Sequence, residues 1–90
     1  MAWSSRARVK LLFFAKSREL CGCKEDHITV QSPTSFRNLL NTLTNKYNSL
    51  STISGNLILA LNQEYLERDS ENINLNAGDE IAVIPPISGG

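Results

Sequence analysis

One segment of this chain, residues 36–47, has the apolar spacing of an amphipathic helix, and it limits the folds that the chain can adopt. Apolar side chains recur there at i, i+3, i+4, i+7 and i+11, and mostly polar side chains fill the other positions. A single helix with a single apolar stripe can cover only one face of a β-sheet. Pro33 precedes the segment, and Thr34 or Ser35 can serve as its N-cap. The stripe consists of Phe36, Leu39, Leu40, Leu43 and Tyr47.

Short segments on both sides of this helix have the alternation or the apolar content of β-strands. Two of them precede the helix and the others follow it, so we expect an α+β, two-layer domain with a mixed sheet of about five strands. The first two strands should pair antiparallel, and the last strand should lie parallel beside the first. This is the order of the β-grasp, or ubiquitin-like, fold. The expected strands are 8–16, 28–30, 57–61, 64–66 and 80–84.

These segments divide the chain into three parts. We expect residues 1–7 to be a flexible N-terminal extension, residues 8–85 to form the β-grasp domain, and residues 86–90 to be a flexible C-terminal tail. Pro85 and Pro86 should end the last strand, because neither residue can donate a hydrogen bond to the sheet.

The charge of the chain argues against several classes of partner. Nine basic residues balance nine acidic ones, and no block of positive charge marks a nucleic-acid or membrane surface. The longest apolar run, residues 11–15, is too short to cross a bilayer. The N-terminus lacks the apolar region of a secretion signal, so we expect the protein in the cytosol.

The two cysteines do not have the spacing of a metal site. Cys21 and Cys23 are separated by one residue, which does not suit a zinc knuckle, and the single histidine, His27, cannot complete a site alone. We expect two reduced thiols in a loop, with a redox or sulfur-relay role as the alternative. We expect this chain to bind no metal and no cofactor.

The chain ends in two glycines, Gly89 and Gly90, which add conformational entropy and no packing. Because glycine has no Cβ, this end can enter a channel that would exclude a side chain. Six extended residues from Pro85 onward reach roughly 20 Å, which would place the terminal carboxylate inside a partner's active site. ATP can activate a carboxylate as an acyl-adenylate, and attack by sulfide then leaves a thiocarboxylate, a good sulfur nucleophile. We therefore expect the reactive group at Gly90 and the activating enzyme on another chain.

The sheet face opposite the helix gives a second indication of function. Strand alternation places Phe14 and Ile84 on this face, and Tyr65 can join them after the third strand turns. An apolar patch of these three side chains would be costly to leave in water, and such patches usually mark a partner. The alternative is that the loop at 48–56 or the loop at 67–78 covers the patch.

Three stretches of the sequence resemble the family of molybdopterin synthase small subunits. The resemblance covers roughly residues 8–90, and the closing stretch is the most specific part of it. The stretches are 9–20, 61–65 and 78–90, with the sequences VKLLFFAKSREL, LNQEY and GDEIAVIPPISGG.

The resemblance implies a defined role in molybdenum cofactor biosynthesis. It implies that an E1-like adenylyltransferase and sulfurtransferase uses ATP to adenylate Gly90 and converts it to a thiocarboxylate. The tail, with Gly89 needed for passage, would then donate sulfur to cyclic pyranopterin monophosphate in the large catalytic subunit. The implied assembly is a heterotetramer with two large subunits at its centre, and the small subunit is not an enzyme on its own. The implied docking residues are Phe14, Tyr65, Ile84, Pro85, Pro86, Ile87 and Ser88.

Two other functions stay open. A related sulfur carrier for tRNA thiolation or thiamine synthesis would share the fold and the Gly-Gly end, although the stretch 78–90 fits those carriers poorly. A ubiquitin-like protein modifier would instead join Gly90 to a lysine side chain through an isopeptide bond. Sequence patterning alone does not separate a modifier from a sulfur donor.

Overall fold

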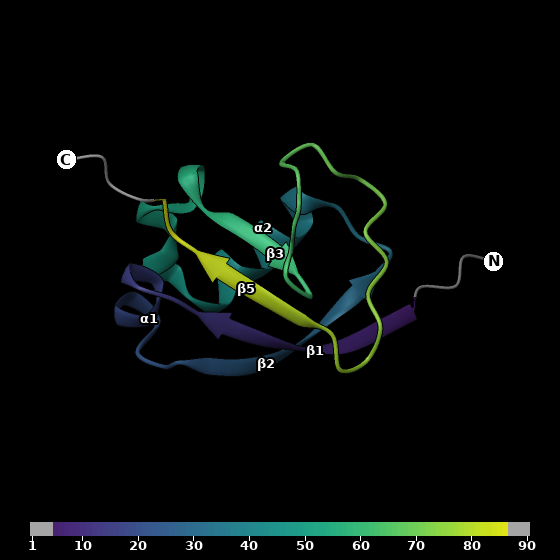
Figure 1. Cartoon of the computed structure of the whole chain (residues 1–90), viewed down its shortest axis with the longest axis horizontal. Coiled ribbons are helices and arrows are strands. Elements are labelled where there is room, and N and C mark those ends of the chain that lie inside the picture. Colours follow the sequence, from purple (N-terminus) through teal and green to yellow (C-terminus); the bar gives the residue numbers. More distant parts are fainter. Residues whose placement is uncertain (1–4, 87–90) are drawn as a thin grey trace.

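The alternating apolar residues near the N-terminus form a central strand of a five-stranded sheet in a computed structural model that describes residues 5–86 (Figure 1). Strand β1 (Ser5–Phe13) pairs antiparallel with β2 (Glu25–Ser32) and parallel with β5 (Glu80–Ile84). Strand β5 also pairs antiparallel with β3 (Ile58–Leu61), which pairs antiparallel with the two-residue β4 (Glu64–Tyr65). The resulting strand order, β2-β1-β5-β3-β4, confirms the predicted β-grasp arrangement with the first and last strands parallel.

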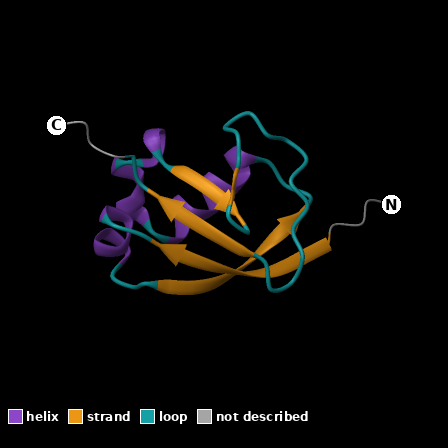
Figure 2. Cartoon of the chain, in the orientation of Figure 1, coloured by secondary structure: helices purple, strands orange, loops and turns teal. Residues whose placement is uncertain are grey.

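Helix α2 (Phe36–Lys46) packs on one face of this sheet (Figure 2). The Ser35 hydroxyl caps its N-terminus by accepting a 3.1 Å hydrogen bond from the Asn38 N–H, as one of the two predicted caps would. The other helical segments are short. They are α1 (Lys16–Cys21) and the 3₁₀ helices η1 (Asn48–Thr52) and η2 (Ser54–Asn56).

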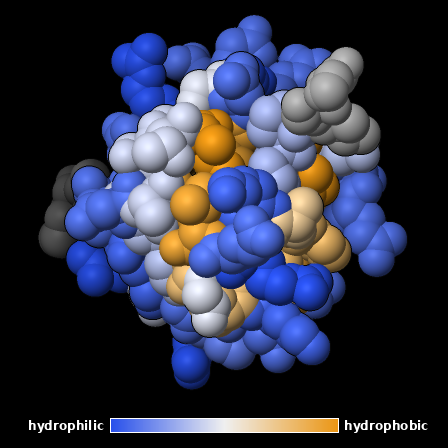
Figure 3. Space-filling model, turned by 90° about the vertical axis from the view of Figure 1, so that its left-hand side faces the viewer, coloured by the Kyte–Doolittle hydropathy of each residue, from blue (hydrophilic) through white to orange (hydrophobic). Residues whose placement is uncertain are grey.

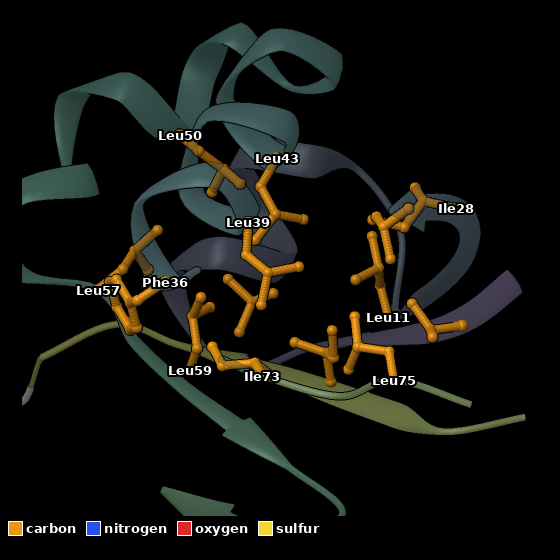
Figure 4. Packing of buried hydrophobic residues seen from close by; sticks show 14 of the residues in the cluster. Leu11, Ile28, Phe36, Leu39, Leu43, Leu50, Leu57, Leu59, Ile73 and Leu75 are labelled. Atoms are coloured by element: carbon orange, nitrogen blue, oxygen red, sulfur yellow. The ribbon is translucent and has the colours of Figure 1, made fainter. Parts of the chain in front are cut away.

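The core lies between α2 and the sheet (Figure 4). Every second residue of β1 is buried there, beginning with Ala7 and ending with Phe13. The helix contributes its predicted stripe, of which Phe36, Leu39 and Leu43 are buried, while Leu40 and Tyr47 are partly buried. Burying an aliphatic side chain of this kind contributes roughly 1.5–3 kcal/mol, so this layer supplies most of the stability of the fold.

The predicted bounds of the first strand were wrong, because β1 begins at Ser5 and not at residue 8. Residues 5–7, which we placed in the N-terminal extension, pair with residues 30–32 of a second strand that is longer than predicted. At its other end β1 stops at Phe13, because Ala15 has a φ of 52° and turns the chain away from the sheet into α1. Since alternation along the strand is unchanged, the predicted faces of β1 are still correct.

The loops that join these elements close the core on its remaining sides. Ile73 and Leu75 are buried, and Ile73 exchanges two backbone hydrogen bonds with Thr34, of 2.9 and 2.8 Å. After β5, Pro85 is buried and Pro86 is exposed. Residues 1–4 and 87–90 lie outside the described part of the chain, so the predicted extension and tail are described only where they adjoin the domain.

Candidate functional site

The face of the sheet that α2 does not cover carries a row of apolar residues across four strands. Leu12 of β1 pairs with Ala82 of β5, which pairs with Ala60 of β3, which in turn pairs with Tyr65 of β4. Directly paired residues on neighbouring strands share one face of a sheet. The alternating neighbours of this row, such as Leu11 and Leu59, are fully buried on the helix side. The row therefore lies on the open face, as predicted for the alternation in β1 and β5.

A second apolar row lies beside the first, toward the end of the sheet at which β5 stops. Ile58 pairs with Ile84, and Phe14 continues β1 beyond its last paired residue, where its N–H donates a 3.3 Å hydrogen bond to the Val83 carbonyl. Phe14 is 42% exposed, Ile58 is 39% exposed and Tyr65 is 77% exposed. The loops at 48–56 and 67–78 therefore do not bury these side chains. We call the two rows together the open-face patch; it consists of Leu12, Phe14, Ile58, Ala60, Tyr65, Ala82 and Ile84.

The open-face patch is hollow where its residues are smallest. Ala60 and Ala82 stand between larger side chains of the first row, and a cavity of about 130 Å³ lies over them. Leu12, Phe14, Gln63 and Glu80 complete its lining. A hollow with mostly apolar walls in an exposed sheet face can accept an apolar side chain from another protein.

Charged residues border this patch on the side of β2 and at the start of β5. The Lys10 ammonium lies 2.9 Å from a carboxylate oxygen of Glu25 and 3.9 Å from one of Glu80. The hydrogen bond and the charge of Glu25 raise the pKa of Lys10, and Lys10 in turn lowers the pKa of Glu25. These side chains are exposed, so the pairs contribute little to stability, but they give the apolar patch a polar rim.

Figure 3 views the molecule from the side on which β5 ends, where the chain continues toward its C-terminus. Hydrophobic residues gather near the middle of this side, and hydrophilic residues surround them. The end of β5 therefore lies where an apolar surface is available to a partner.

The prediction of two free thiols in a loop is correct for Cys23, which lies between α1 and β2, and wrong in the position of Cys21. Cys21 is the last residue of α1 rather than a loop residue, and both Cys21 and Cys23 are free thiols packed against the core. Burial, with a smaller contribution from Cys23, raises the pKa of the Cys21 thiol to about 11. A thiol with a raised pKa is a poor nucleophile at neutral pH. This environment does not favour a redox or sulfur-relay role for Cys21.

Beside these thiols, the hydroxyl of Tyr47 donates a hydrogen bond to the Asp26 carboxylate. That bond and the His27 N–H, 2.8 Å from Asp26 Oδ1, lower the pKa of Asp26 to about 2. Lys46 pairs with the same carboxylate at 3.3 Å. These contacts join Asp26 of β2 to Lys46 and Tyr47 at the end of α2. We interpret them as structural contacts between the two elements.

Residues 5–86 contain no group of three or more histidine, cysteine, aspartate or glutamate side chains arranged to hold a metal ion. Within the same residues, none of the helices has both the length and the apolar content needed to cross a bilayer.

The structure brings together three of the predicted docking residues on the open face of the sheet. Phe14 and Ile84 belong to one row of the open-face patch and Tyr65 to the other. Pro85 is buried and Pro86 is exposed, and the two follow directly after β5. The remaining predicted site residues, Ile87, Ser88, Gly89 and Gly90, lie outside the described residues.

Two members of the open-face patch, Ile58 and Ala60, were missed by the sequence prediction. The strand 57–61 is apolar throughout, so alternation alone does not show which of its residues face the helix. The pairing register with β5 decides this, because Ala60 lies opposite Ala82 and Ile58 opposite Ile84. A sequence argument that aligned the two strands could have found both residues.

Comparison with known proteins agrees with this architecture. Residues 11–90 match the model of the ThiS family. The chain is 49% identical to a molybdopterin synthase sulfur carrier subunit of Anopheles gambiae over 92 aligned positions, which cover 100% of both chains. It is 39% identical to the subunit of the same name from Homo sapiens, with 92% of this chain and 94% of that one covered.

Solved structures also resemble it. The small archaeal modifier protein 1 of Methanosarcina acetivorans matches with a TM-score of 0.71 and 27% identity, covering 96% of this chain and 99% of that one. A chain in the complex of subunits 1 and 2 of the molybdopterin-converting factor of Helicobacter pylori matches with a TM-score of 0.64 and 24% identity, covering 92% and 99%. This second likeness concerns the fold alone. The family match includes the C-terminal glycines, and the relatives align over nearly their full length. The chain therefore belongs to the ThiS family, in the group of molybdopterin synthase sulfur carrier subunits.

Proposed function

We propose that this chain carries sulfur on the terminal carboxyl group of Gly90 and delivers it to a pterin substrate in the active site of a separate large subunit. The observation that carries the proposal is the position of the chain's end. β5 runs through the middle of the sheet and stops at Ile84, inside the open-face patch, and the sequence then continues as PPISGG. A partner that covers the patch would therefore receive the residues after Pro86 at its own surface.

Loading and transfer of sulfur require no catalytic group on this chain. The Gly90 carboxylate attacks the α-phosphate of ATP on an E1-like enzyme, which forms an acyl-adenylate and releases pyrophosphate. A sulfide equivalent then attacks the acyl carbon and displaces AMP, which leaves a thiocarboxylate. The thiocarboxylate sulfur is nucleophilic and would attack a carbon of cyclic pyranopterin monophosphate in the large subunit, where a C–S bond forms as the C–O bond at that carbon breaks and its oxygen substituent leaves. Hydrolysis of the resulting acyl–sulfur bond returns the Gly90 carboxylate, so the chain can be loaded again.

We propose the large catalytic subunit of molybdopterin synthase as the partner on the open-face patch, in a heterotetramer with two large subunits at its centre. Phe14 and Tyr65 are exposed and Ile84 is partly exposed, and the cavity above Ala60 and Ala82 can receive a side chain of the partner. The Helicobacter pylori protein that shares this fold is described as a complex of subunits 1 and 2. We place the reaction in the cytosol.

The length of the tail provides the test of this function. Deleting Gly90, or adding one alanine after it, should abolish pterin dithiolene formation by the reconstituted synthase, because the reacting atom is lost or displaced. One alanine added before Met1 is the matched control, since β1 begins at the other end of the sheet from the end of β5. Circular dichroism should show the same fold for all variants. Normal activity of the chain extended after Gly90 would rule out the proposed chemistry.

A protein modifier is the second candidate, because the chain resembles the small archaeal modifier protein 1 of Methanosarcina acetivorans at 27% identity. The two functions leave different products on Gly90. Intact mass spectrometry of the chain isolated from cells should find one oxygen replaced by sulfur if the chain is a sulfur donor. Isopeptide bonds between Gly90 and lysines of other proteins would instead support the modifier.

A further inference from the structure

Ser17 is fully buried, and its hydroxyl lies at the point where β1 and β5 separate. The Ser17 Oγ is 2.7 Å from the Phe14 carbonyl oxygen and 2.9 Å from the Val83 carbonyl oxygen, so its single proton is shared between the two strands. The same oxygen accepts a 3.0 Å hydrogen bond from the Phe14 N–H. One hydroxyl therefore connects Phe14, the residue after β1, to Val83, the second-last residue of β5.

The hydrogen-bond ladder explains why a side chain is needed at this point. Lys10 N–H donates to the Asp79 carbonyl at 2.8 Å, and four residues later Phe14 N–H donates to the Val83 carbonyl at 3.3 Å. In a parallel ladder the next donor, to the Phe14 carbonyl, would be the N–H of residue 85. Residue 85 is proline and has no N–H. Ser17 takes its place, because both its Oγ–H and its N–H, 3.1 Å away, donate to the Phe14 carbonyl.

The two residues that Ser17 joins have different roles in the proposed function, on which this inference rests. Phe14 belongs to the open-face patch, whereas Val83 lies two residues before Pro85, at the root of the tail. We infer that Ser17 is a positioning residue for sulfur transfer, and that its hydroxyl fixes the direction in which the tail leaves β5 relative to the docking face. It touches neither the reacting carboxyl group nor the substrate.

A purely structural role for Ser17 makes a different prediction, and Ser32 provides the matched control. Ser32 is the other buried serine of residues 5–86, with 7% exposure, and its Oγ accepts a 2.8 Å hydrogen bond from the Leu75 N–H. It pairs with Ser5 at the opposite end of β1 from Phe14. Ser17→Ala and Ser32→Ala each remove one buried hydroxyl that accepts a backbone N–H. Only Ser17→Ala removes the hydroxyl hydrogen bonds that link Phe14 of the open-face patch to Val83, near the end of β5.

The experiment measures single-turnover sulfur transfer from thiocarboxylate-loaded carrier to cyclic pyranopterin monophosphate on the large subunit, over a range of carrier concentrations. The temperature is set well below the melting transitions of all variants, which are recorded separately. We expect Ser17→Ala to lower the rate at saturation by about tenfold or more, because small displacements of reacting groups have effects of this size. The half-saturating concentration should change less than about twofold, because the docking side chains remain. Ser32→Ala should transfer sulfur at the wild-type rate.

Ser17→Cys keeps nearly the same volume but is a weak donor, so it tests the same idea if the alanine variant does not fold. We expect a lower saturating rate for it as well. Equal saturating rates for wild type, the folded Ser17 variants and Ser32→Ala would overturn the positioning role and leave the proposed function intact. An inactive, loaded wild type would instead overturn the proposed function itself.

Discussion

Replacing Tyr65 by alanine should separate binding to the large subunit from stability of the fold, because this side chain is the most exposed large apolar group in the described chain. An aromatic side chain has about 150–250 Å² of surface, so an exposed fraction of 77% leaves roughly 115–190 Å² in water. At about 25 cal/mol per Å², covering this surface could contribute at most roughly 3–5 kcal/mol to binding. Only part of this free energy appears as binding affinity, because association also costs entropy and desolvation. Truncating an anchoring side chain typically costs about 2 kcal/mol of binding free energy.

We therefore expect Tyr65→Ala to weaken binding to the large subunit by about 30-fold, which corresponds to about 2 kcal/mol. Isothermal titration calorimetry with purified subunits measures this change. Tyr65→Phe keeps the ring and should bind within about threefold of the wild type, apart from any hydrogen bond of the hydroxyl. Asn41→Ala changes an exposed residue of α2, on the other side of the sheet, and should have no effect.

The stability of Tyr65→Ala should stay within about 0.5 kcal/mol of the wild type, as for other exposed side chains. Binding of Tyr65→Ala within twofold of the wild type would show that the partner does not cover this part of the open-face patch. The docking surface would then have to lie away from Tyr65.

Two further predictions concern the stability of the domain. The pKa of Asp26 is lowered from 3.8 to about 2, chiefly by the Tyr47 hydroxyl, so its contribution is present above about pH 4 and is lost as the pH falls toward 2. Asp26→Asn should therefore lower the melting temperature at pH 7 and flatten its decrease between pH 4 and 2; an unchanged acid profile would contradict the link to Tyr47. Gly78 has a φ of 89° and open space around a Cβ, so Gly78→Ala should cost about 1–2 kcal/mol from backbone strain alone. Gly55 also has open space around a Cβ but does not have a positive φ, so Gly55→Ala should be neutral or slightly stabilising. Chemical denaturation measures the free energy of unfolding of both variants, and equal effects at the two glycines would refute the argument.

The helix and the faces of the strands could be predicted from the sequence because each depends on local periodicity. The stripe from Phe36 to Tyr47 and the alternation from Ala7 to Phe13 both face the core. The ends of the strands depend on pairing partners far away in the sequence. Residues 5–7 join the sheet because β2 extends to Ser32, and no local signal in residues 5–7 indicates this.

The site was predictable to a similar degree. Phe14, Tyr65 and Ile84 follow from alternation and from a family resemblance, and all three lie on the open face. Ile58 and Ala60 required the register of β3 against β5, which the sequence of β3 alone does not contain. The role of Ser17 required three-dimensional structure, because its partner Val83 is 66 residues away along the chain.

The parallel pairing of β1 and β5 has a practical consequence for handling the protein. Because the two strands run in the same direction, β1 starts at the end of the sheet opposite to the one where β5 stops (Figure 1). An affinity tag, dye or solid support attached through the residues before Ser5 should therefore leave the other end accessible. The protein could be immobilised in this orientation on a sensor surface, and its enzymes could then load and unload it while the measurement runs.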